Sequence, residues 1–381
     1  MMKAVFLTHT AAPSGAELAT LRLVTALPGH LDTAVVYTAD GPMVAKTRAR
    51  AIETHLVAND TDSATLTIAN AGLPRLAAGV VRLIRLGWTL GRVMRDLEAS
   101  VVVAQSAKAL VIGAAAAGRA RIPLVWQVHD RISAEYFGRT LAPMIRVFGW
   151  LVARGYIANS RSTLGSLITW RRPAVVAYPG LEARPPDRRE DQRPPSDTIV
   201  TVVGRLAPWK GQDLFLRALA EVRTRPRRVF LVGGALFGEE AFRAELEQLT
   251  TEYDLPVTFT GHVDDPDAYM YRSDVLVHCT LLAEPFGQVV VEGMRAGCAV
   301  IATRPGGPTE IVEPGIDGLL VDGGDRGQLT EALNTLIEDR ALRVRLAAAA
   351  RVRARRFDVA ESARVVADFL AAVPRNRHGR A

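Results

Sequence analysis

Short apolar runs alternate with stretches of helical periodicity along the first half of the chain. Leu18, Leu21, Val24 and Leu27 recur at three-residue intervals and predict an amphipathic helix. Apolar runs that predict β-strands lie at residues 4–8, 33–37, 101–104, 123–128, 156–158 and 174–177. Because parallel neighbouring strands need helical crossovers, this alternation predicts an α/β domain with a parallel sheet.

The alternation restarts after a polar segment rich in proline, residues 184–196, whose composition is typical of a linker. Further strands are predicted at 198–203, 228–232, 257–260, 275–278 and 299–302. Ligands of such sheets bind beyond the carboxyl ends of the strands, so a cleft between the two α/β domains is the expected site. The predicted organisation is a first domain over 1–184, a linker over 185–197, a second domain over 198–357, and a helix and tail over 358–381 that pack back on the first domain.

Composition places the chain among ordinary globular proteins. Its 381 residues are 49% hydrophobic and 23% charged, enough to bury a large core without disulfides. The two cysteines, Cys279 and Cys298, lack partners at zinc-ligand spacing, which fits a reducing compartment. The apolar run at 109–118 is about half of a membrane span, and the N-terminal run is too short for a signal peptide. We therefore expect a cytoplasmic protein.

The net charge of +7 is unevenly distributed. Residues 1–185 hold 21 Lys and Arg against 11 Asp and Glu, whereas the remainder holds 26 against 29. This asymmetry suggests that the first half meets an anionic partner, and nucleic acid, a membrane surface and a phosphorylated substrate all qualify. No helix-turn-helix, zinc-finger or RNA-recognition pattern is present, so nucleic acid is not expected as a partner.

A basic amphipathic segment at 72–99 contributes much of this charge. Its five arginines occupy one helical sector, with Leu, Val and Met residues opposite, and a break is expected near Gly87. One interpretation is a surface helix whose arginines are solvated. The other is docking to anionic lipid headgroups on the inner membrane face. The arginines are Arg75, Arg82, Arg85, Arg92 and Arg95.

The densest chemical signal is a pair of glutamates at residues 284–297. A loop with Pro285 and Gly287 leads into a helix predicted to begin near Gln288, and the first turn of such a helix favours an anion. Glu284 precedes this helix and Glu292 lies about one turn inside it, so both carboxylates can face one ligand and bind its neutral hydroxyls. The alternative is that Glu284 caps the helix and Glu292 is a solvated surface residue.

Two cations follow the first strand of the second domain. Arg205 and Lys210 lie between Gly204 and Gly211, a combination that suits a diphosphate, although a solvated turn is the alternative. The segment 304–310 adds a further glycine loop after a later strand. Neither half has a clean Gly-x-Gly-x-x-Gly pattern.

Taken together, these motifs resemble the retaining glycosyltransferases of family 4, which have the GT-B fold of two Rossmann-like domains. The resemblance spans essentially the whole chain, and its most specific element is Glu-x7-Glu at Glu284 and Glu292. In the first half, Gly15 with Glu17 resembles the family's N-terminal glycine loop, and His129 with Asp130 falls at a strand end where the family has such residues. The supporting segments are 204–211, 306–310, 315–321 and 159–160.

The resemblance implies a hexosyl transfer from a UDP- or GDP-linked sugar to a hydroxyl of a lipid-linked, polysaccharide or small-molecule acceptor. Arg205, Lys210, Glu284 and His129 would be the catalytic residues, with the cations on the diphosphate, Glu284 on sugar hydroxyls and His129 near the transferred sugar. The donor would also be bound by Gly15, by the loop at Val263, by the backbone at Phe286, Gly287 and Gln288, and by Glu292. No metal or other cofactor is predicted.

The sequence departs from the family pattern at two places. Ser14 replaces the first of two adjacent glycines, so only Gly15 can approach the donor without a side chain, and Tyr178-Pro179-Gly180 stands where Pro-Asn-Gly is common. His129 has the alternative interpretation of a satisfied strand-end histidine. A non-catalytic nucleotide-sugar-binding protein and a sugar-nucleotide epimerase of the same fold remain the alternative functions.

Overall fold

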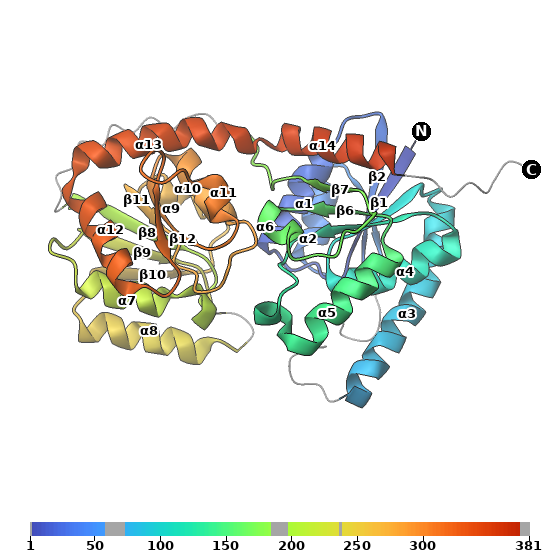
Figure 1. Ribbon diagram of the computed structural model, residues 1–381, viewed down its shortest axis with the longest axis horizontal. Coiled ribbons are helices and arrows are strands. Elements are labelled where there is room, and N and C mark those ends of the chain that lie inside the picture. The colour runs from blue at the N-terminus through green and yellow to red at the C-terminus, as the bar shows by residue number, and fades with distance from the viewer. Residues whose placement is uncertain (1, 58–72, 184–196, 236–237, 374–381) are drawn as a thin grey trace, which may run out of the picture. The chain divides into compact units, whose positions relative to one another are not determined.

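The chain folds into two compact α/β units (Figure 1). The computed structural model describes residues 2–57, 73–183, 197–235 and 238–373. The first unit comprises residues 1–182 together with 359–381, and the second comprises 183–358. The predicted linker at 185–197 falls almost entirely outside the described residues.

The first unit is built on a parallel sheet of seven strands in the order β3-β2-β1-β4-β5-β6-β7. Its strands are β1 (Met2–Thr8), β2 (Leu31–Tyr37), β3 (Glu53–Leu56), β4 (Val101–Ala104), β5 (Leu124–Val128), β6 (Gly155–Ala158) and β7 (Ala174–Val176). All were predicted except β3, which lies at the sheet edge and has no fully buried residue, so it lacks an apolar run.

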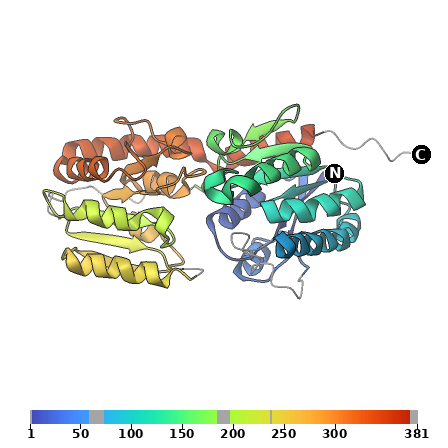
Figure 2. The same ribbon diagram turned by 60° about the horizontal axis from the view of Figure 1, so that its bottom comes forward.

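Helices cover both faces of this sheet (Figure 2). They are α1 (Gly15–Ala26), α2 (Pro42–Ala49), α3 (Leu73–Asp96), α4 (Ala107–Ala120), α5 (Ala134–Val152), α6 (Arg161–Leu164) and α14 (Val359–Ala372). Although α14 follows the second unit in sequence, it packs against α1 and β7 and buries Val366 and Leu370 in the first unit's core. The Val359 N–H donates to the Leu181 carbonyl at 3.1 Å. The chain therefore leaves the first unit and returns to it at neighbouring residues.

The expected break near Gly87 is wrong, because α3 runs unbroken through this residue. A Cβ at Gly87 would lie 2.2 Å from the carbonyl oxygen of Ile112 on α4 and 2.8 Å from the Ala115 Cβ. The glycine therefore allows two helix backbones to approach closely, and it does so without ending the helix.

The second unit has a parallel sheet of six strands in the order β10-β9-β8-β11-β12-β13. Its strands are β8 (Ile199–Val203), β9 (Arg228–Val232), β10 (Val257–Gly261), β11 (Val275–Val277), β12 (Ala299–Arg304) and β13 (Leu319–Asp322), of which only β13 was not predicted. Its helices are η3 (Pro208–Lys210), α7 (Gln212–Ala220), α8 (Glu240–Glu252), α9 (Asp267–Met270), α10 (Gln288–Ala296), α11 (Pro308–Ile311), α12 (Arg326–Glu338), α13 (Arg340–Ala354) and η4 (Arg355–Phe357).

The strand order reverses once in each sheet, between β1 and β4 in the first unit and between β8 and β11 in the second. Ligands of open α/β sheets bind at the carboxyl ends of the strands that flank such a reversal. In the second unit, the loop after β8 carries Arg205 and Lys210, and the loop after β11 carries Glu284. The fold therefore brings the predicted cations and the first glutamate to the carboxyl ends of two neighbouring strands.

We expect Gly87→Ala to lower the free energy of unfolding by about 2 kcal/mol, because its Cβ would overlap the α4 backbone. Gly118→Ala on α4 is the matched control. Its Cβ would meet no atom within 4 Å, so this change should stabilise by roughly 1 kcal/mol through helix propensity. Thermal denaturation of both variants measures the difference, and equal stabilisation by the two changes would contradict the packing role of Gly87.

Candidate active site

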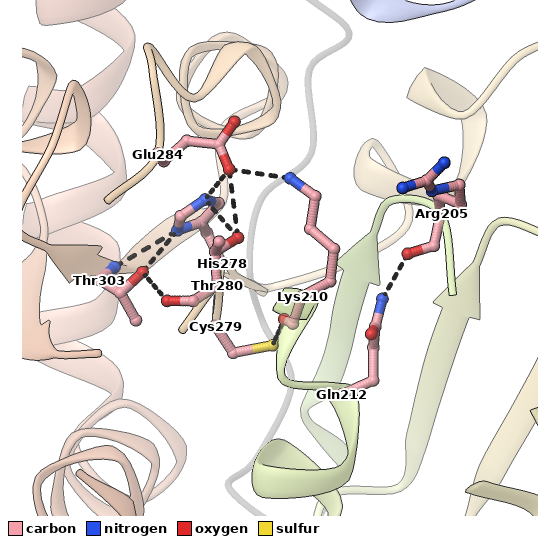
Figure 3. A network of polar contacts seen from close by, with 8 residues as sticks. All are labelled: Arg205, Lys210, Gln212, His278, Cys279, Thr280, Glu284 and Thr303. Atoms are coloured by element: carbon pink, nitrogen blue, oxygen red, sulfur yellow. Dashed lines mark hydrogen bonds and ion pairs between the residues drawn. The ribbon is translucent and has the colours of Figure 1, made fainter. Parts of the chain in front are cut away.

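Lys210 and Glu284 form a direct ion pair at the strand reversal of the second unit (Figure 3). Lys210 Nζ lies 2.8 Å from Glu284 Oε2, and the two side chains are only 20% and 15% exposed. The pair joins the loop after β8 to the loop after β11, so two motifs far apart in sequence form one polar site.

Backbone contacts hold Lys210 in place. The Leu281 N–H donates to the Trp209 carbonyl at 2.9 Å, and Cys279 Sγ lies 3.3 Å from the Lys210 carbonyl oxygen. Gly211 follows in a left-handed conformation with φ of 70°, and a Cβ there would lie 2.2 Å from the Cys279 carbonyl oxygen. The turn therefore docks directly on the segment that follows β11.

The loop that carries Glu284 is held from the other side by Gly306 and Gly307. The Gly307 N–H donates to the Glu284 carbonyl at 2.8 Å, and Glu284 pairs with Gly306 as an isolated β-bridge. A Cβ at Gly306 would lie 2.4 Å from the Glu284 carbonyl oxygen, and one at Gly307 would lie 2.3 Å from Phe286 Cα. These glycines thus allow the loop to pack close behind the glutamate.

Three donors converge on one oxygen of the Glu284 carboxylate. Besides Lys210, His278 Nε2 lies 3.4 Å and Thr280 Oγ1 3.3 Å from Oε2. Burial opposes the charge of this carboxylate, but Lys210 and His278 outweigh it and hold the pKa of Glu284 well below its usual range. No contact with Oε1 is present among the described residues, and Figure 3 shows this oxygen turned away from Lys210 and His278.

Arg205 lies apart from this ion pair. Its Nε is 3.4 Å from Glu239 Oε2 at the start of α8, and its backbone carbonyl accepts a hydrogen bond from Gln212 Nε2 at 2.8 Å. The guanidinium lies 5.8 Å and Lys210 Nζ 4.3 Å from the ring centroid of Trp209. Both predicted cations therefore border one indole ring.

The remaining predicted donor residues of the second unit lie at and along α10 and in the loop after β10. Gly287 precedes α10 with φ of 99°, and Gln288 is the first residue of the helix, whose N-terminus has no side-chain cap. Phe286 is buried against Phe357, so only its backbone can meet a ligand. Glu292 is half-buried in α10, and Val263 is half-buried after β10. The alternative that Glu284 caps this helix is wrong, because Gly287 occupies the cap position.

In the first unit, His129 follows β5 and belongs to a buried network of amide side chains. Its Nε2 lies 2.9 Å from Gln105 Oε1, which also accepts from the Thr20 hydroxyl at 2.8 Å. Gln105 Nε2 donates to Gln127 Oε1 at 3.1 Å, and Asn159 Nδ2 donates to the His129 carbonyl at 2.7 Å. These partners come from α1 and from the ends of β4, β5 and β6.

This network determines the proton position on His129. Because the Gln105 amide nitrogen donates to Gln127, its oxygen must accept from His129 Nε2, so Nε2 carries the proton. Burial lowers the pKa of His129 to about 4, and the ring is neutral at pH 7. His129 therefore offers Nδ1 as a hydrogen-bond acceptor and is not an acid.

Gly15 is the first residue of α1, and Ser14 occupies the cap position before it. The Ser14 hydroxyl donates to the Glu17 carboxylate, the residue three positions later. Burial raises the pKa of this carboxylate, and the Ser14 hydrogen bond opposes that rise. The serine at the position of the missing glycine thus anchors Glu17 at the first turn of the helix.

Two family profiles cover most of the chain. "Glycosyltransferase Family 4" matches residues 13–184, and "Glycosyl transferases group 1" matches residues 183–353. The lipopolysaccharide core biosynthesis glycosyltransferase LpsD of Rhizobium meliloti is 33% identical over 285 residues, which cover 71% of this chain and 76% of LpsD. The chain is a family 4 glycosyltransferase.

Other relatives of this family 4 glycosyltransferase are similar over comparable lengths. The D-inositol 3-phosphate glycosyltransferase of Nocardioides sp. is 30% identical over 291 residues, which cover 68% of this chain and 64% of that one. The crystal structure of Anabaena Alr3699/HepE in complex with UDP and glucose superposes with a TM-score of 0.80 at 30% identity, and covers 98% of this chain and 100% of HepE. These matches bear out the predicted GT-B fold.

Sequence reasoning missed several polar residues of this family 4 enzyme. His278, Thr280 and Thr303 surround Glu284, while Gln105 and Gln127 surround His129. Their signal is weak but visible, because His278 and Gln105 are polar residues that directly follow the apolar strands β11 and β4.

Within the described residues, no group of three or more His, Cys, Asp or Glu side chains is arranged to hold a metal ion. The same residues contain no helix with the length and apolar character needed to cross a membrane. The expected independence from metals stays a prediction.

The buried His129 and the half-buried His9 make the stability of the first unit depend on pH. Desolvation lowers the pKa of His129 to about 4, and desolvation together with the charge of Lys108 lowers the pKa of His9 to about 4, from about 6.5 in the unfolded chain. Between these values the unfolded chain binds more protons, so stability is fully present above pH 6.5 and falls as the pH drops towards 4. Each histidine should lower the free energy of unfolding by about 2 kcal/mol between pH 7 and pH 5.

We expect His129→Gln to reduce this pH-dependent loss by about 2 kcal/mol, because the uncharged amide has no proton to take up. Denaturant unfolding at pH 7 and pH 5, followed by tryptophan fluorescence, measures it, since four of the five tryptophans lie in the first unit. His30→Gln, at an exposed position, is the control. An identical pH dependence in wild type and His129→Gln would contradict the assigned neutral ring.

Proposed function

We propose that the protein transfers a hexosyl group from a UDP-linked sugar to an acceptor hydroxyl, with retention of configuration. The observation that carries this proposal is the Lys210–Glu284 pair at the carboxyl ends of β8 and β11. Support for the donor comes from HepE, whose structures with UDP and with UDP-glucose share about 30% identity with this chain over nearly its whole length. A GDP-linked donor is the second possibility.

The cations would bind the diphosphate. Lys210 and Arg205 border Trp209, and a diphosphate between them would stabilise Lys210 as Glu284 does in the free protein. As the glycosidic bond breaks, negative charge develops on the leaving phosphate, and fixed cations stabilise that charge in the transition state. Backbone N–H groups at the start of α10 would add to this effect through the helix dipole.

The two glutamates would bind hydroxyl groups. Glu284 Oε1 would accept from a sugar hydroxyl, and Glu292 would accept from the ribose. The low pKa of Glu284 excludes it as the proton-donating acid of a glycosidase-like pair. We propose instead a front-face reaction in which the leaving phosphate helps to deprotonate the acceptor.

His129 would contribute from the first unit as a neutral hydrogen-bonding group. Its Nδ1 can accept a hydrogen bond from a hydroxyl of the transferred sugar, while Gln105 holds Nε2. Gly15 at the start of α1 would approach the donor through its backbone. The acceptor would be lipid-linked, a polysaccharide or a small molecule, as suggested by relatives that act in lipopolysaccharide core biosynthesis and on inositol 3-phosphate.

We also propose that the enzyme works in the cytoplasm, at an anionic membrane surface that α3 contacts. Val81, Ile84 and Trp88 are solvent-exposed at the spacing of one helix face. Aliphatic side chains with a tryptophan are suited to the boundary between lipid headgroups and acyl chains.

Arginines surround this exposed apolar stripe. Arg119 of α4 lies over the Trp88 ring at 4.8 Å, and desolvation together with Arg92 and Arg95 lowers the pKa of its guanidinium. Among the described residues, none of these three arginines forms an ion pair with a carboxylate. The unbalanced positive charge beside exposed apolar side chains favours anionic lipid over a protein partner. Arg75 lies outside the described side chains.

We expect Lys210→Gln to reduce kcat by about 100-fold or more, since it removes a cation from the leaving phosphate. Glu284→Gln should have a comparable effect. The double variant should lose less kcat than the two single-variant fold-reductions multiplied together, because the residues act as one pair. UDP release from UDP-glucose and product analysis measure these effects. Arg345→Gln, at an exposed site on α13, is the control.

The same assay separates the alternative functions. A non-catalytic binder would show UDP-sugar affinity without UDP release, and an epimerase would convert the sugar without an acceptor. Full activity in both single variants would contradict the assigned site.

We expect binding to vesicles of phosphatidylcholine mixed with an equal amount of phosphatidylglycerol, and little binding to phosphatidylcholine alone. Arg92→Glu should weaken it about tenfold, since each basic residue near the surface contributes roughly 1 kcal/mol. Trp88→Ser should also weaken it. Arg345→Glu makes the same charge change in the second unit and should have no effect. Vesicle flotation measures all four proteins, and equal recovery with both lipid compositions would remove the membrane proposal.

A further inference from the structure

His278 lies buried behind Glu284 and contacts polar groups through both ring nitrogens (Figure 3). On one side, Nε2 is 3.0 Å from Thr280 Oγ1 and 3.4 Å from Glu284 Oε2. On the other side, Nδ1 is 3.1 Å from Thr303 Oγ1 and 3.4 Å from the Thr303 backbone nitrogen. The ring therefore bridges the ends of β11 and β12.

These contacts determine which ring nitrogen carries the proton. A backbone N–H can only donate, so the Thr303 amide requires Nδ1 to accept, and the proton of the neutral ring lies on Nε2. The Nε2–H then faces both Thr280 Oγ1 at 3.0 Å and Glu284 Oε2 at 3.4 Å, and the Thr280 hydroxyl donates to the same Oε2. The Thr303 hydroxyl lies 2.9 Å from the Thr280 carbonyl oxygen and 3.1 Å from Nδ1, so these two acceptors share its single proton, while the Thr303 backbone N–H donates to Nδ1.

We propose that His278 is a positioning residue, held by Thr303, that fixes the Glu284 carboxylate so that Oε1 faces the donor sugar. This inference rests on the proposed function and adds residues to its site. Lys210 alone would leave the carboxylate able to rotate about its last torsion, because a lysine ammonium contacts either oxygen equally well. The Nε2–H and the Thr280 hydroxyl both select Oε2, and they remain in place when Lys210 turns towards a diphosphate.

The role separates sugar recognition from nucleotide recognition. A misoriented Glu284 loses its contact with a sugar hydroxyl, whereas the uridine and phosphates have other partners. His278→Leu introduces an apolar side chain of similar bulk and removes the Nε2–H that donates to Glu284. His278→Gln places an amide N–H near the former Nε2 position and should restore the contact with Oε2.

We expect His278→Leu to weaken UDP-glucose binding and to slow UDP release from UDP-glucose by about tenfold each, which corresponds to the loss of one hydrogen bond to a charged group. Affinity for UDP, which lacks the sugar, should stay within a factor of two. His278→Gln should recover most of the loss. Isothermal titration with UDP and UDP-glucose, together with the UDP-release assay, measures these values.

Thr303→Val should reproduce part of the effect, since it removes the hydroxyl at Nδ1 but keeps the backbone N–H. Thr330→Val is the matched control, because Thr330 is equally buried in the second unit and its hydroxyl bonds to backbone on α12 and α7. Circular dichroism and thermal denaturation establish that each variant is folded.

The outcomes distinguish this inference from the proposed function. Wild-type protein that binds neither UDP nor UDP-glucose would overturn the proposed function. Wild-type protein that binds both, with His278→Leu losing affinity for UDP and UDP-glucose equally, would show that His278 only supports the fold and would overturn the positioning role. A folded His278→Leu variant with unchanged values would overturn it as well, as would the absence of rescue by His278→Gln.

Discussion

The ion pair between Lys210 and Glu284 depends on close backbone packing on both sides. The turn that carries Lys210 contacts the segment after β11 through Gly211, and the loop that carries Glu284 contacts the segment after β12 through Gly306 and Gly307. Breaking one partner of a largely buried pair leaves an uncompensated charge, so this geometry is strongly selected once the backbone has folded. The site is therefore as rigid as the strand ends that support it.

His129 and His278 are both buried at the carboxyl end of a strand, but their rings are oriented in different ways. His129 is oriented by amide side chains that define a donor and an acceptor, so its remaining nitrogen can face a ligand. His278 is oriented by a backbone amide and acts on a carboxylate instead of on a ligand. In both cases the fold determines a proton position, which is a stronger constraint on chemistry than the presence of an imidazole alone.

Much of the fold was predictable because buried parallel strands are short apolar runs, and eleven of the thirteen strands of the described residues were predicted from that signal. β3 lacks the signal because its sequence, Glu-Thr-His-Leu, is largely polar and none of its residues is fully buried. The role of Gly87 was not predictable, since the reason for the glycine is an atom of α4 and not a local conformation.

The site shows the same division between local and tertiary information. The glutamates and cations follow from motif spacing. The selection of Oε2 by three donors, the contact of Arg205 with Glu239 and the role of Gln105 depend on residues brought together by tertiary structure. Motifs identify which residues carry the chemistry, and packing determines which atoms of those residues are available.

The position of α14 has a consequence for synthesis on the ribosome. Val366 and Leu370 complete the core of the first unit, but they are translated after the whole of the second unit. The second unit is a continuous segment and can finish folding while the first still exposes the apolar face of α1 that α14 will cover. The N-terminal unit is thus the last to be completed, and a nascent chain stalled before residue 359 would present its uncovered surface to chaperones.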